Sequence, residues 1–311
     1  MRLRLRRSEV PGRRAFNRAL GALPLMAMMP AAGAQALLTR VIPASGERVP
    51  VVGLGTWQVF DVAASGADYA AARATLKAFA DGGGRLVDSS PMYGRSESVL
   101  GELMAEERLR ARLFVATKVW TRGRREGALQ MRDSMAKLKV DSLDLMQVHN
   151  LTDTDTHLDT LAGWKREGRV RLIGITHYHA GAHRELEAAL KKHRLDVVQV
   201  NYSLAEREAG ERLIPACRDL GAALIVNRPF AEGALFGRVR GRALPGWVGA
   251  ELGIESWAQY FLKWILAADG ITVVIPGTRN PRHVVDNLSA ARGTLPDAAQ
   301  RERMRADFAA L

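Results

Sequence analysis

Short apolar runs and longer segments of helical period alternate eight times along this chain. Short runs rich in β-branched residues are typical of buried strands, and longer segments with apolar residues three or four positions apart are typical of amphipathic helices. We expect strands over residues 51–54, 85–88, 113–118, 143–149, 170–176, 197–200, 223–227 and 271–275. We expect helices over residues 68–81, 96–108, 126–139, 156–167, 182–192, 207–220, 254–267 and 282–290. Eight strand–helix pairs in roughly 250 residues predict an α/β protein, a (β/α)8 TIM barrel.

The segments outside this pattern refine the fold. A β-hairpin is expected before the first strand, over residues 37–50, with its turn at 44–47. A Rossmann sheet is disfavoured, because Gly53 and Gly55 are followed by neither a third glycine nor an obvious helix. The one long connection, 228–253, follows the seventh strand, and loops of that length are usually functional or disordered. In barrels the loops after strands seven and eight commonly build a phosphate site.

The net charge of +12 suggests a nucleic acid or an anionic membrane as partner until its distribution is considered. Residues 1–34 contain seven arginines and one glutamate, so half of the net charge lies in this short segment. The remaining chain is only mildly basic and carries no nucleic-acid-binding motif, so we expect no nucleic-acid partner. A single cysteine, Cys217, excludes an intrachain disulfide and a zinc ribbon, and we expect it to be a small buried residue.

The N-terminus is organised as an export signal. An arginine-rich stretch precedes the apolar run 19–32, and small residues at 32–36 offer cleavage after Ala34 or Ala36. Arg13-Arg14-Ala15-Phe16 resembles the bacterial twin-arginine signal, which implies the twin-arginine (Tat) export machinery as a partner and a periplasmic location. A spanning helix needs roughly 20 apolar residues, so no permanent membrane anchor is expected. We therefore divide the chain into a signal peptide, 1–36, and a barrel, 37–311; if the signal is not used, the protein stays in the cytoplasm.

Polar side chains end several of the expected strands. Asp88 ends the second strand, Tyr93 follows it, and Lys118 and His149 end the third and fourth strands. Barrel active sites form at the carboxyl ends of the strands, so these four side chains are expected to meet there. A buried lysine is costly unless it is paired, so we expect an ion pair between Lys118 and Asp88 that lowers the pKa of Tyr93. Tyr93 would then donate a proton to a carbonyl oxygen, and His149 would orient that carbonyl.

These residues resemble the aldo-keto reductase superfamily over nearly the whole barrel. The segment 87–101 is similar to the second-strand signature of that family, and the segments 114–120 and 144–149 are similar to those that supply its lysine and histidine. The resemblance implies the catalytic tetrad Asp88, Tyr93, Lys118 and His149. It implies hydride transfer from a nicotinamide cofactor to an aldehyde or ketone.

The resemblance also implies binding residues. Substrate contacts are expected from Trp57, Tyr93, Trp120 and His149. Cofactor contacts are expected from Gly55, Thr56, Trp57, Asp88, Thr176, His177, Gln199, Arg228, Phe230, Gly277, Thr278, Arg279 and Asn287. The chain departs from the family pattern at Thr176-His177, where Ser-Asn is common, and after strand seven, where a stacking tyrosine is common.

The segment that follows the eighth strand bears on the cofactor. Asn280 and Pro281 are a good N-cap and first residue of a helix, so the residues before them can offer backbone donors to a phosphate. The segment resembles the family's binding site for the adenosine 2′-phosphate, although Gly277 and His283 replace its usual lysine and arginine. NADPH is therefore the expected cofactor, and NADH is possible.

Two other functions are compatible with parts of the sequence. A barrel with an intact tetrad can bind NADPH as a sensor or partner protein with little turnover. His177, His179 and His183 could instead hold a metal ion with an activated water in a barrel hydrolase, although His183 is expected to start the next helix and no carboxylate ends the eighth strand to complete the site. We expect no metal. The substrate, the role of His177 and the oligomeric state are not defined by these patterns.

Overall fold

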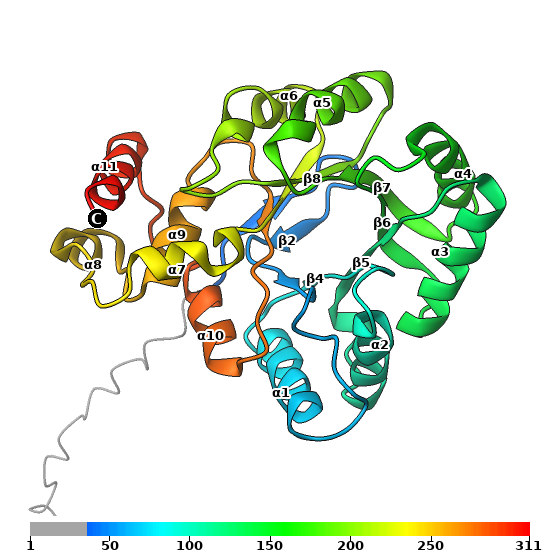
Figure 1. The fold of residues 1–311 in the computed structure, drawn as a ribbon, viewed down its shortest axis with the longest axis horizontal. Helices are drawn as coiled ribbons and strands as arrows, with labels where there is room; N and C mark the ends of the chain where they lie inside the picture. Colours follow the sequence, from blue (N-terminus) through cyan, green and yellow to red (C-terminus); the bar gives the residue numbers. More distant parts are fainter. Residues whose placement is uncertain (1–35) are drawn as a thin grey trace, which may run out of the picture. The chain divides into compact units, whose positions relative to one another are not determined.

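Eight parallel strands form one sheet in which every strand pairs with the next strand along the chain. The computed structural model describes residues 36–311 (Figure 1). The expected signal peptide lies outside the described residues, apart from its last position. The strands are β3 (Leu54–Gly55), β4 (Leu86–Asp88), β5 (Phe114–Val119), β6 (Leu143–His149), β7 (Val170–Thr176), β8 (Val197–Asn201), β9 (Ala223–Asn227) and β10 (Val273–Val274).

The first and last strands close the sheet into a barrel. The Gly53 amide donates to the Val274 carbonyl at 2.8 Å, and the Val274 amide donates to the Val51 carbonyl at 2.9 Å. Gly55 continues this seam through a bridge to Gly277. A β-carbon at Gly55 would lie 3.0 Å from the Ile275 carbonyl oxygen, so a larger residue there would press on the strand across the seam. The expected (β/α)8 barrel is therefore confirmed.

Helices surround the barrel (Figure 1). Those that follow the strands are α1 (Ala67–Asp81), α2 (Ser96–Glu106), α3 (Arg124–Leu138), α4 (Thr154–Arg166), α5 (His183–Lys192), α6 (Leu213–Asp219), α9 (Trp257–Leu266) and α10 (Pro281–Ser289). The helix expected over 207–220 is shorter than predicted, because Pro215 lacks an amide hydrogen and fits only the first turn of α6. The connection 228–253 is not structureless, since it contains α7 (Ala234–Arg238) and α8 (Gly246–Leu252). On one side α8 lies beside the C-terminal helix α11 (Ala298–Ala309).

The strands alternate between two faces, and this alternation places the polar side chains. On β6, Leu145 belongs to the cluster inside the barrel, while Met146 and Val148 belong to the cluster between the sheet and the helices. Gln147 and His149 share the inward face with Leu145, because successive strand residues point to opposite sides. The same period brings the polar residues of the neighbouring strands to the carboxyl end of the barrel interior.

The N-terminal hairpin closes the opposite end of the barrel. Its strands β1 (Thr39–Val41) and β2 (Arg48–Pro50) pair antiparallel, as the sequence predicts. Ile42 and Val49 belong to the same apolar cluster as the barrel interior. Glu47, in the turn of the hairpin, accepts hydrogen bonds from Arg85 at 2.8 Å and from Arg171 at 2.6 Å. The hairpin therefore fills the amino-terminal end of the barrel with apolar side chains and covers it with ion pairs.

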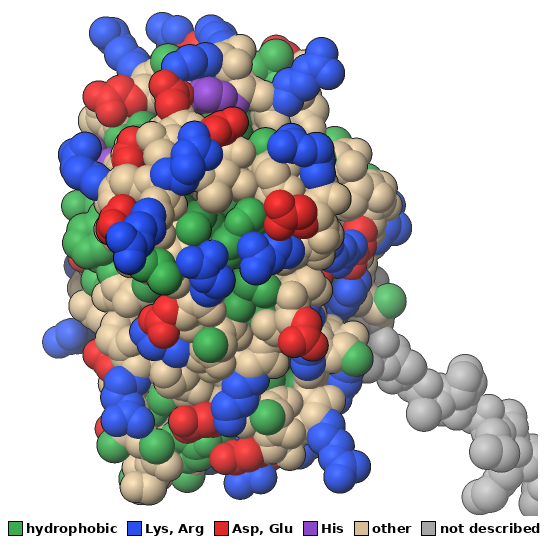
Figure 2. Space-filling model, turned by 90° about the vertical axis from the view of Figure 1, so that its right-hand side faces the viewer, with side chains coloured by type: hydrophobic (Ala, Val, Ile, Leu, Met, Phe, Trp, Pro, Cys, Tyr) green, Lys and Arg blue, Asp and Glu red, His purple; other side chains and the backbone are tan. Residues whose placement is uncertain are grey.

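The surface charge is mixed. Figure 2 shows one face on which lysine and arginine side chains are interspersed with aspartate and glutamate. Among residues 36–311, no helix has both the length and the apolar character that crossing a membrane would require.

Candidate active site

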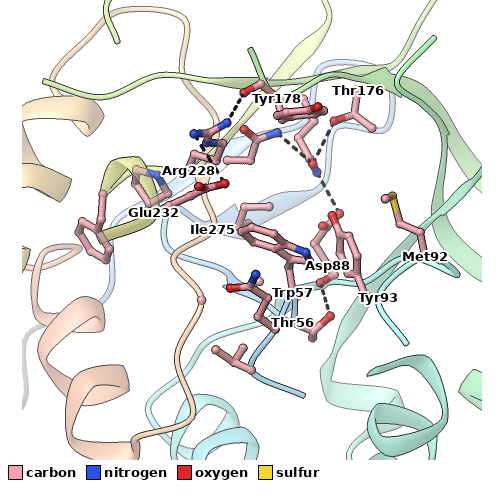
Figure 3. A pocket seen from close by; sticks show the side chains of 18 of the residues that line it. Thr56, Trp57, Asp88, Met92, Tyr93, Thr176, Tyr178, Arg228, Glu232 and Ile275 are labelled. Carbon is pink, nitrogen blue, oxygen red and sulfur yellow. Dashed lines mark hydrogen bonds and ion pairs between the residues drawn. The ribbon is translucent and has the colours of Figure 1, made fainter. Parts of the chain in front are cut away.

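A pocket of about 660 Å³ opens at the carboxyl ends of the strands (Figure 3). Residues on or directly after β3, β4, β5, β6, β7, β8 and β9 all line it, as expected for the mouth of a barrel. The expected site residues that line it are Gly55, Thr56, Trp57, Asp88, Tyr93, Trp120, His149, Thr176, His177, Gln199, Arg228, Phe230 and Gly277.

A buried ion pair forms the base of this pocket. Asp88 is 2% exposed and Lys118 is fully buried. The Lys118 ammonium donates to Asp88 Oδ2 at 2.5 Å and to the Ser89 carbonyl at 2.7 Å. Burial disfavours the charged lysine, but Asp88 and Tyr93 outweigh it and hold the pKa of Lys118 above its usual value. The expected ion pair is present, and Lys118 keeps its positive charge.

The second oxygen of Asp88 is held by two amide side chains. Gln199 Nε2 donates to Asp88 Oδ1 at 2.9 Å, and Gln147 Nε2 donates to the same oxygen at 3.2 Å. Sequence reasoning missed Gln147, although its place on the inward face two residues before His149 was a usable signal. Gln199 Oε1 also accepts from Thr176 Oγ1 at 3.1 Å. Gln199 therefore holds the ion pair, in addition to any contact with a cofactor.

Tyr93 lies beside the ion pair. The Lys118 ammonium is 5.0 Å from the centre of the Tyr93 ring and acts on its hydroxyl through charge and hydrogen bonding. Burial nevertheless raises the pKa of Tyr93 above its usual value, and the ammonium offsets only part of this. The expectation of a lowered pKa is therefore wrong for the free protein. Tyr93 is fully protonated at neutral pH and holds a proton that it can donate.

The loop that carries Tyr93 is fixed on both sides. The Ser96 amide, at the start of α2, donates to the Tyr93 carbonyl at 3.1 Å. Asp61 Oδ1 accepts from the Arg95 amide at 2.9 Å. Between them Gly94 has a φ of +58°, and a β-carbon there would lie 2.4 Å from the Asp61 carboxylate. Only glycine fits this turn, so the phenol is presented by a rigid loop.

His149 faces Tyr93 across the pocket floor. The two rings are perpendicular, with centres 5.9 Å apart. His149 Nδ1 lies 3.1 Å from Ser90 Oγ, which can donate to it and leave the proton on Nε2. Burial, helped by the charge of Lys118, lowers the pKa of His149 to about 2. The imidazole is therefore neutral at physiological pH, and its Nε2 hydrogen is available for a hydrogen bond.

The comparisons with known proteins agree with this geometry. A family model described as the aldo/keto reductase family matches residues 51–304. The chain belongs to the aldo/keto reductase family. It is therefore an oxidoreductase, and the resemblance seen in its sequence is confirmed.

Individual aldo/keto reductases match over most of the chain. A methylglyoxal reductase of Escherichia coli (strain K12) is 27% identical over 270 residues, which is 83% of this chain and 92% of that protein. An NADH-specific methylglyoxal reductase of the same organism is 26% identical over 268 residues, 68% of this chain and 80% of that protein. The structure of an aldo-keto reductase from Klebsiella pneumoniae in complex with NADPH superposes with a TM-score of 0.74 at 24% identity, covering 88% of this chain and 95% of that one. This last likeness concerns the fold.

The structure shows how this aldo/keto reductase accommodates its unusual Thr176-His177 pair. Thr176 is buried, and its hydroxyl donates to Gln199. His177 Nδ1 accepts from the Tyr178 amide at 3.0 Å, which places the ring proton of a neutral imidazole on Nε2. Burial, together with His179 and His183, lowers the pKa of His177 to about 4. His177 thus brings a neutral donor to the pocket.

The segment after strand seven departs further from the aldo/keto reductase pattern. Asn227 Nδ2 donates to the His177 carbonyl at 3.0 Å, while Asn227 Oδ1 is buried without a partner. Arg228 Nη1 donates to the Tyr178 carbonyl at 3.1 Å and Nη2 lies 3.6 Å from Glu232, but Nε is buried without a partner. These orphaned atoms border the pocket, so a bound molecule can satisfy them.

The remaining expected cofactor residues do not line the pocket; Thr278 and Arg279 lie just before α10, and Asn287 lies near its end. Thr278 Oγ1 accepts from the Asn280 amide at 3.1 Å, and Asn280 caps α10 as predicted. Arg279 pairs with Asp68 of α1 at 3.1 Å. Asn287 is buried, 5% exposed, within α10. Cofactor binding by these residues stays a prediction, and the sequence did not reveal the partner of Arg279.

The histidines that could have held a metal lie near one another, with the rings of His177 and His179 4.3 Å apart, but they are not arranged as a ligand set. His177 Nδ1 is engaged by the Tyr178 amide, and His183 Nε2 lies 3.0 Å from Asn201 Oδ1. In the part of the chain from residue 36 onward, no group of three or more His, Cys, Asp or Glu side chains could hold a metal ion. The geometry thus gives no support to the metal-dependent hydrolase.

Proposed function

We propose that this protein reduces an aldehyde or ketone to an alcohol with NADPH, or alternatively NADH, and that Tyr93 donates the proton. One observation carries the proposal: a protonated phenol lies at the pocket floor between a buried ammonium and a neutral imidazole. The perturbed pKa values of these groups are typical of a catalytic site.

The residues at the pocket fit a nicotinamide nucleotide. The orphaned Asn227 Oδ1 can accept from a carboxamide, and the orphaned Arg228 Nε can donate to a phosphate. Arg279 and the start of α10 offer a cation and backbone donors to the adenosine end. NADPH is favoured because the Klebsiella pneumoniae reductase was crystallised with it, and NADH is the alternative because one relative is named for it.

The tetrad completes the reduction through one proton transfer. When bound, the cofactor supplies a hydride ion to the carbonyl carbon. Tyr93 donates its phenolic proton to the carbonyl oxygen, so the Tyr93 O–H bond breaks as the alcohol O–H bond forms. His149 holds this oxygen by its Nε2 hydrogen. Lys118 stabilises the tyrosinate that is left, and Asp88 keeps Lys118 charged and in place.

The proposal is tested by turnover of the purified barrel, residues 37–311. We expect loss of NADPH absorbance with methylglyoxal, chosen because two relatives are named for it, and with other reactive aldehydes. Tyr93→Phe should lower kcat by about 100- to 10,000-fold with little change in the dissociation constant of NADPH. Tyr69→Phe, on the outer surface of α1, is the matched control.

Two results contradict the proposal. Full activity in Tyr93→Phe excludes this residue as the proton donor. Tight binding of NADPH without turnover of any carbonyl favours the sensor or partner protein.

We propose separately that residues 1–36 direct export of the folded barrel to the periplasm. The twin-arginine order of Arg13 and Arg14 supports this, and a route that carries folded proteins allows the cofactor to be loaded first. Replacing both arginines by lysine in the full chain should shift the protein from the periplasmic to the cytoplasmic fraction. Equal amounts in the periplasm with and without the arginine pair contradict this proposal.

A further inference from the structure

A buried carboxylate that takes no part in the proposed reaction lies behind the strand that carries Lys118. Glu97, in the first turn of α2, is 1% exposed. Its Oε1 accepts from Thr117 Oγ1 at 2.5 Å, and its Oε2 accepts from Ser134 Oγ at 3.1 Å. Thr117 and Ser134 are fully buried as well. One side chain thus joins α2, β5 and α3 through hydrogen bonds that are sealed from solvent.

The bond to Thr117 bears on the direction of Lys118. The two residues are neighbours on β5, and successive residues of a strand point to opposite faces. Lys118 points into the mouth of the barrel, so Thr117 points toward the helices. The bond to Glu97 therefore fixes the outer face of β5 at the point where Lys118 leaves its inner face. A strand that is held in this way cannot turn freely about its axis, and the Lys118 side chain keeps its direction.

The same carboxylate bears on the position of Tyr93. Glu97 follows Tyr93 by four residues, and the loop between them has little freedom, because the Ser96 amide donates to the Tyr93 carbonyl at 3.1 Å. The helix that carries Glu97 lies directly on α3, since a β-carbon at Gly101 would lie 2.1 Å from the Lys137 carbonyl oxygen. The contact that holds α2 on β5 therefore also sets the distance between the phenol and the ammonium.

Holding a carboxylate in this place costs free energy. Burial raises the pKa of Glu97, and the two hydroxyl groups, together with the charges of Lys137 and Lys118, offset only part of this. Apolar side chains would join the same three elements without that cost, but their contacts have no preferred direction. Hydrogen bonds weaken steeply when they bend, so this network defines a position more narrowly than apolar packing would.

We infer that Glu97 is a positioning residue: by joining α2 to β5, it holds the Tyr93 hydroxyl and the Lys118 ammonium at the separation that proton transfer needs. Glu97 does not line the pocket and acts only through these two residues. A displacement of about 1 Å can slow a reaction about 100-fold, so a contact outside the pocket can control the rate. The inference rests on the proposed reductase function and adds to it a residue outside the tetrad.

Two substitutions of one residue test this link. Valine has the shape of threonine without its hydroxyl group, whereas serine keeps the hydroxyl group. Thr117→Val should lower kcat about 10- to 100-fold, with KM and the dissociation constant of NADPH within about twofold. Thr117→Ser should keep kcat within about threefold. The ratio of kcat in ordinary water to kcat in heavy water should rise in Thr117→Val, because proton transfer from Tyr93 becomes slower.

Thr272→Val is the matched control. It removes another buried threonine hydroxyl, which accepts from the Leu224 amide at 3.0 Å near the start of β9, at the other end of the barrel. Both valine variants should unfold at a lower urea concentration, but only Thr117→Val should lose kcat. Lower stability of Thr117→Val with unchanged kcat and an unchanged ratio between the two waters overturns the inference. Glu97→Gln, which keeps the size but loses one acceptor, should lower kcat about tenfold and tests the same link if Thr117→Val does not fold.

Crystal structures separate this inference from the proposed reaction, because they need no turnover. The Lys118 ammonium lies 5.0 Å from the centre of the Tyr93 ring, and this distance should grow by about 1 Å in Thr117→Val and stay the same in Thr117→Ser. Such a shift supports the inference even if no carbonyl is reduced, in which case only the reductase proposal fails. An unchanged distance in Thr117→Val overturns the inference, whatever the kcat of this variant.

Discussion

The two ends of the barrel use charge in opposite ways. At the amino-terminal end, Glu47 pairs with Arg85 and Arg171 at the surface, over an apolar plug. At the carboxyl end, Asp88 and Lys118 are buried, and neighbouring polar atoms lack partners. At the amino-terminal end, the charged pairs lie at the surface and help to close the fold. At the carboxyl end, the charges are buried, which costs desolvation free energy and is typical of a functional site.

Backbone strain follows the same division. Nine non-glycine residues of the described chain have a positive φ. Seven lie in loops at the carboxyl end: Gln58, Asn150, Leu151, Asp153, Arg228, Ala231 and Glu232. The two others, Arg108 and Lys139, follow helices at the amino-terminal end. Four of the seven, Gln58, Asn150, Arg228 and Glu232, line the pocket, and strained backbone of this kind, which costs about 1 kcal/mol per residue, clusters at functional sites.

The largest expected effect comes from breaking the buried pair at the carboxyl end. Lys118→Met should lower kcat by about 100- to 1,000-fold, because the tyrosinate loses its cation. It should also lower the free energy of unfolding by about 3–5 kcal/mol, because Asp88 is left buried without its counterion. Steady-state kinetics and urea unfolding measure the two effects. Lys137→Met, which removes a surface pair with Asp133, is the control and should change kcat little; equal effects of the two variants would contradict the contrast.

At the amino-terminal end the expected effect is smaller and concerns stability alone. Although burial raises the pKa of Glu47, hydrogen bonds from Arg171 and Arg85 bring it below its usual value. The stability that this adds is present above the unfolded value of about 4.3 and is lost as pH falls through the folded pKa. Glu47→Gln should cost about 1 kcal/mol at pH 7, remove part of the acid sensitivity and leave kcat unchanged. Thermal unfolding between about pH 3 and pH 7 measures this. A fall in kcat would contradict the statement that the amino-terminal end contributes to stability alone.

A still smaller effect is expected from relieving strain. Lys139 ends α3 in the left-handed conformation that glycine adopts freely. Lys139→Gly should stabilise the protein by about 0.5–1 kcal/mol without changing activity. Arg228→Gly relieves similar strain at the mouth but removes the contacts to Tyr178 and Glu232, so it should weaken substrate or cofactor binding. Urea unfolding measures the stability of both variants, and KM values measure their binding. An unchanged KM in Arg228→Gly would show that the strained conformation of Arg228 does not serve binding.

The smallest expected change is in the pH dependence. As the proposed proton donor, Tyr93 has to be protonated; its pKa is raised, so its proton is lost only well above neutral pH. His149, with a pKa of about 2, stays neutral throughout. The value of kcat/KM for reduction should therefore vary by less than about twofold between pH 6 and pH 9. A steep fall through pH 7 to 8 would show that the cofactor or substrate lowers the pKa of Tyr93.

The sequence predicted the parts of this molecule that depend on local pattern. The strands 143–149, 170–176 and 223–227 match the observed bounds, because their β-branched and apolar runs end at clear turns. The meeting of Asp88, Tyr93, Lys118 and His149 was also predicted, since three of them lie at the ends of successive strands and Tyr93 lies in the loop after the first of these, so all four meet at one end of the barrel. The order of the strands in a barrel is enough to predict that these side chains meet, without knowledge of their individual contacts.

What the sequence did not provide depends on long-range contacts. The hydrogen bond from Gln147 to Asp88 joins residues that are 59 positions apart, and no local sequence pattern reveals it. The sign of the pKa shift of Tyr93 depends on how burial compares with the charge of Lys118, which only three-dimensional packing decides. The short helices α7 and α8 are stabilised by packing against the barrel and α11, so the glycine-rich segment 228–253 was taken for an irregular loop.

In the proposed reaction, the cofactor bound at the carboxyl end of the barrel supplies a hydride to a carbonyl carbon, and Tyr93 supplies the proton. The most direct measurement uses NADPH labelled with deuterium at the reactive carbon of the nicotinamide ring, followed by mass spectrometry of the alcohol. Hydride transfer with Tyr93 as proton donor should give an alcohol with one deuterium on the former carbonyl carbon, and almost none from Tyr93→Phe with NADPH still bound. An alcohol without deuterium, or equal yield from Tyr93→Phe, would contradict it.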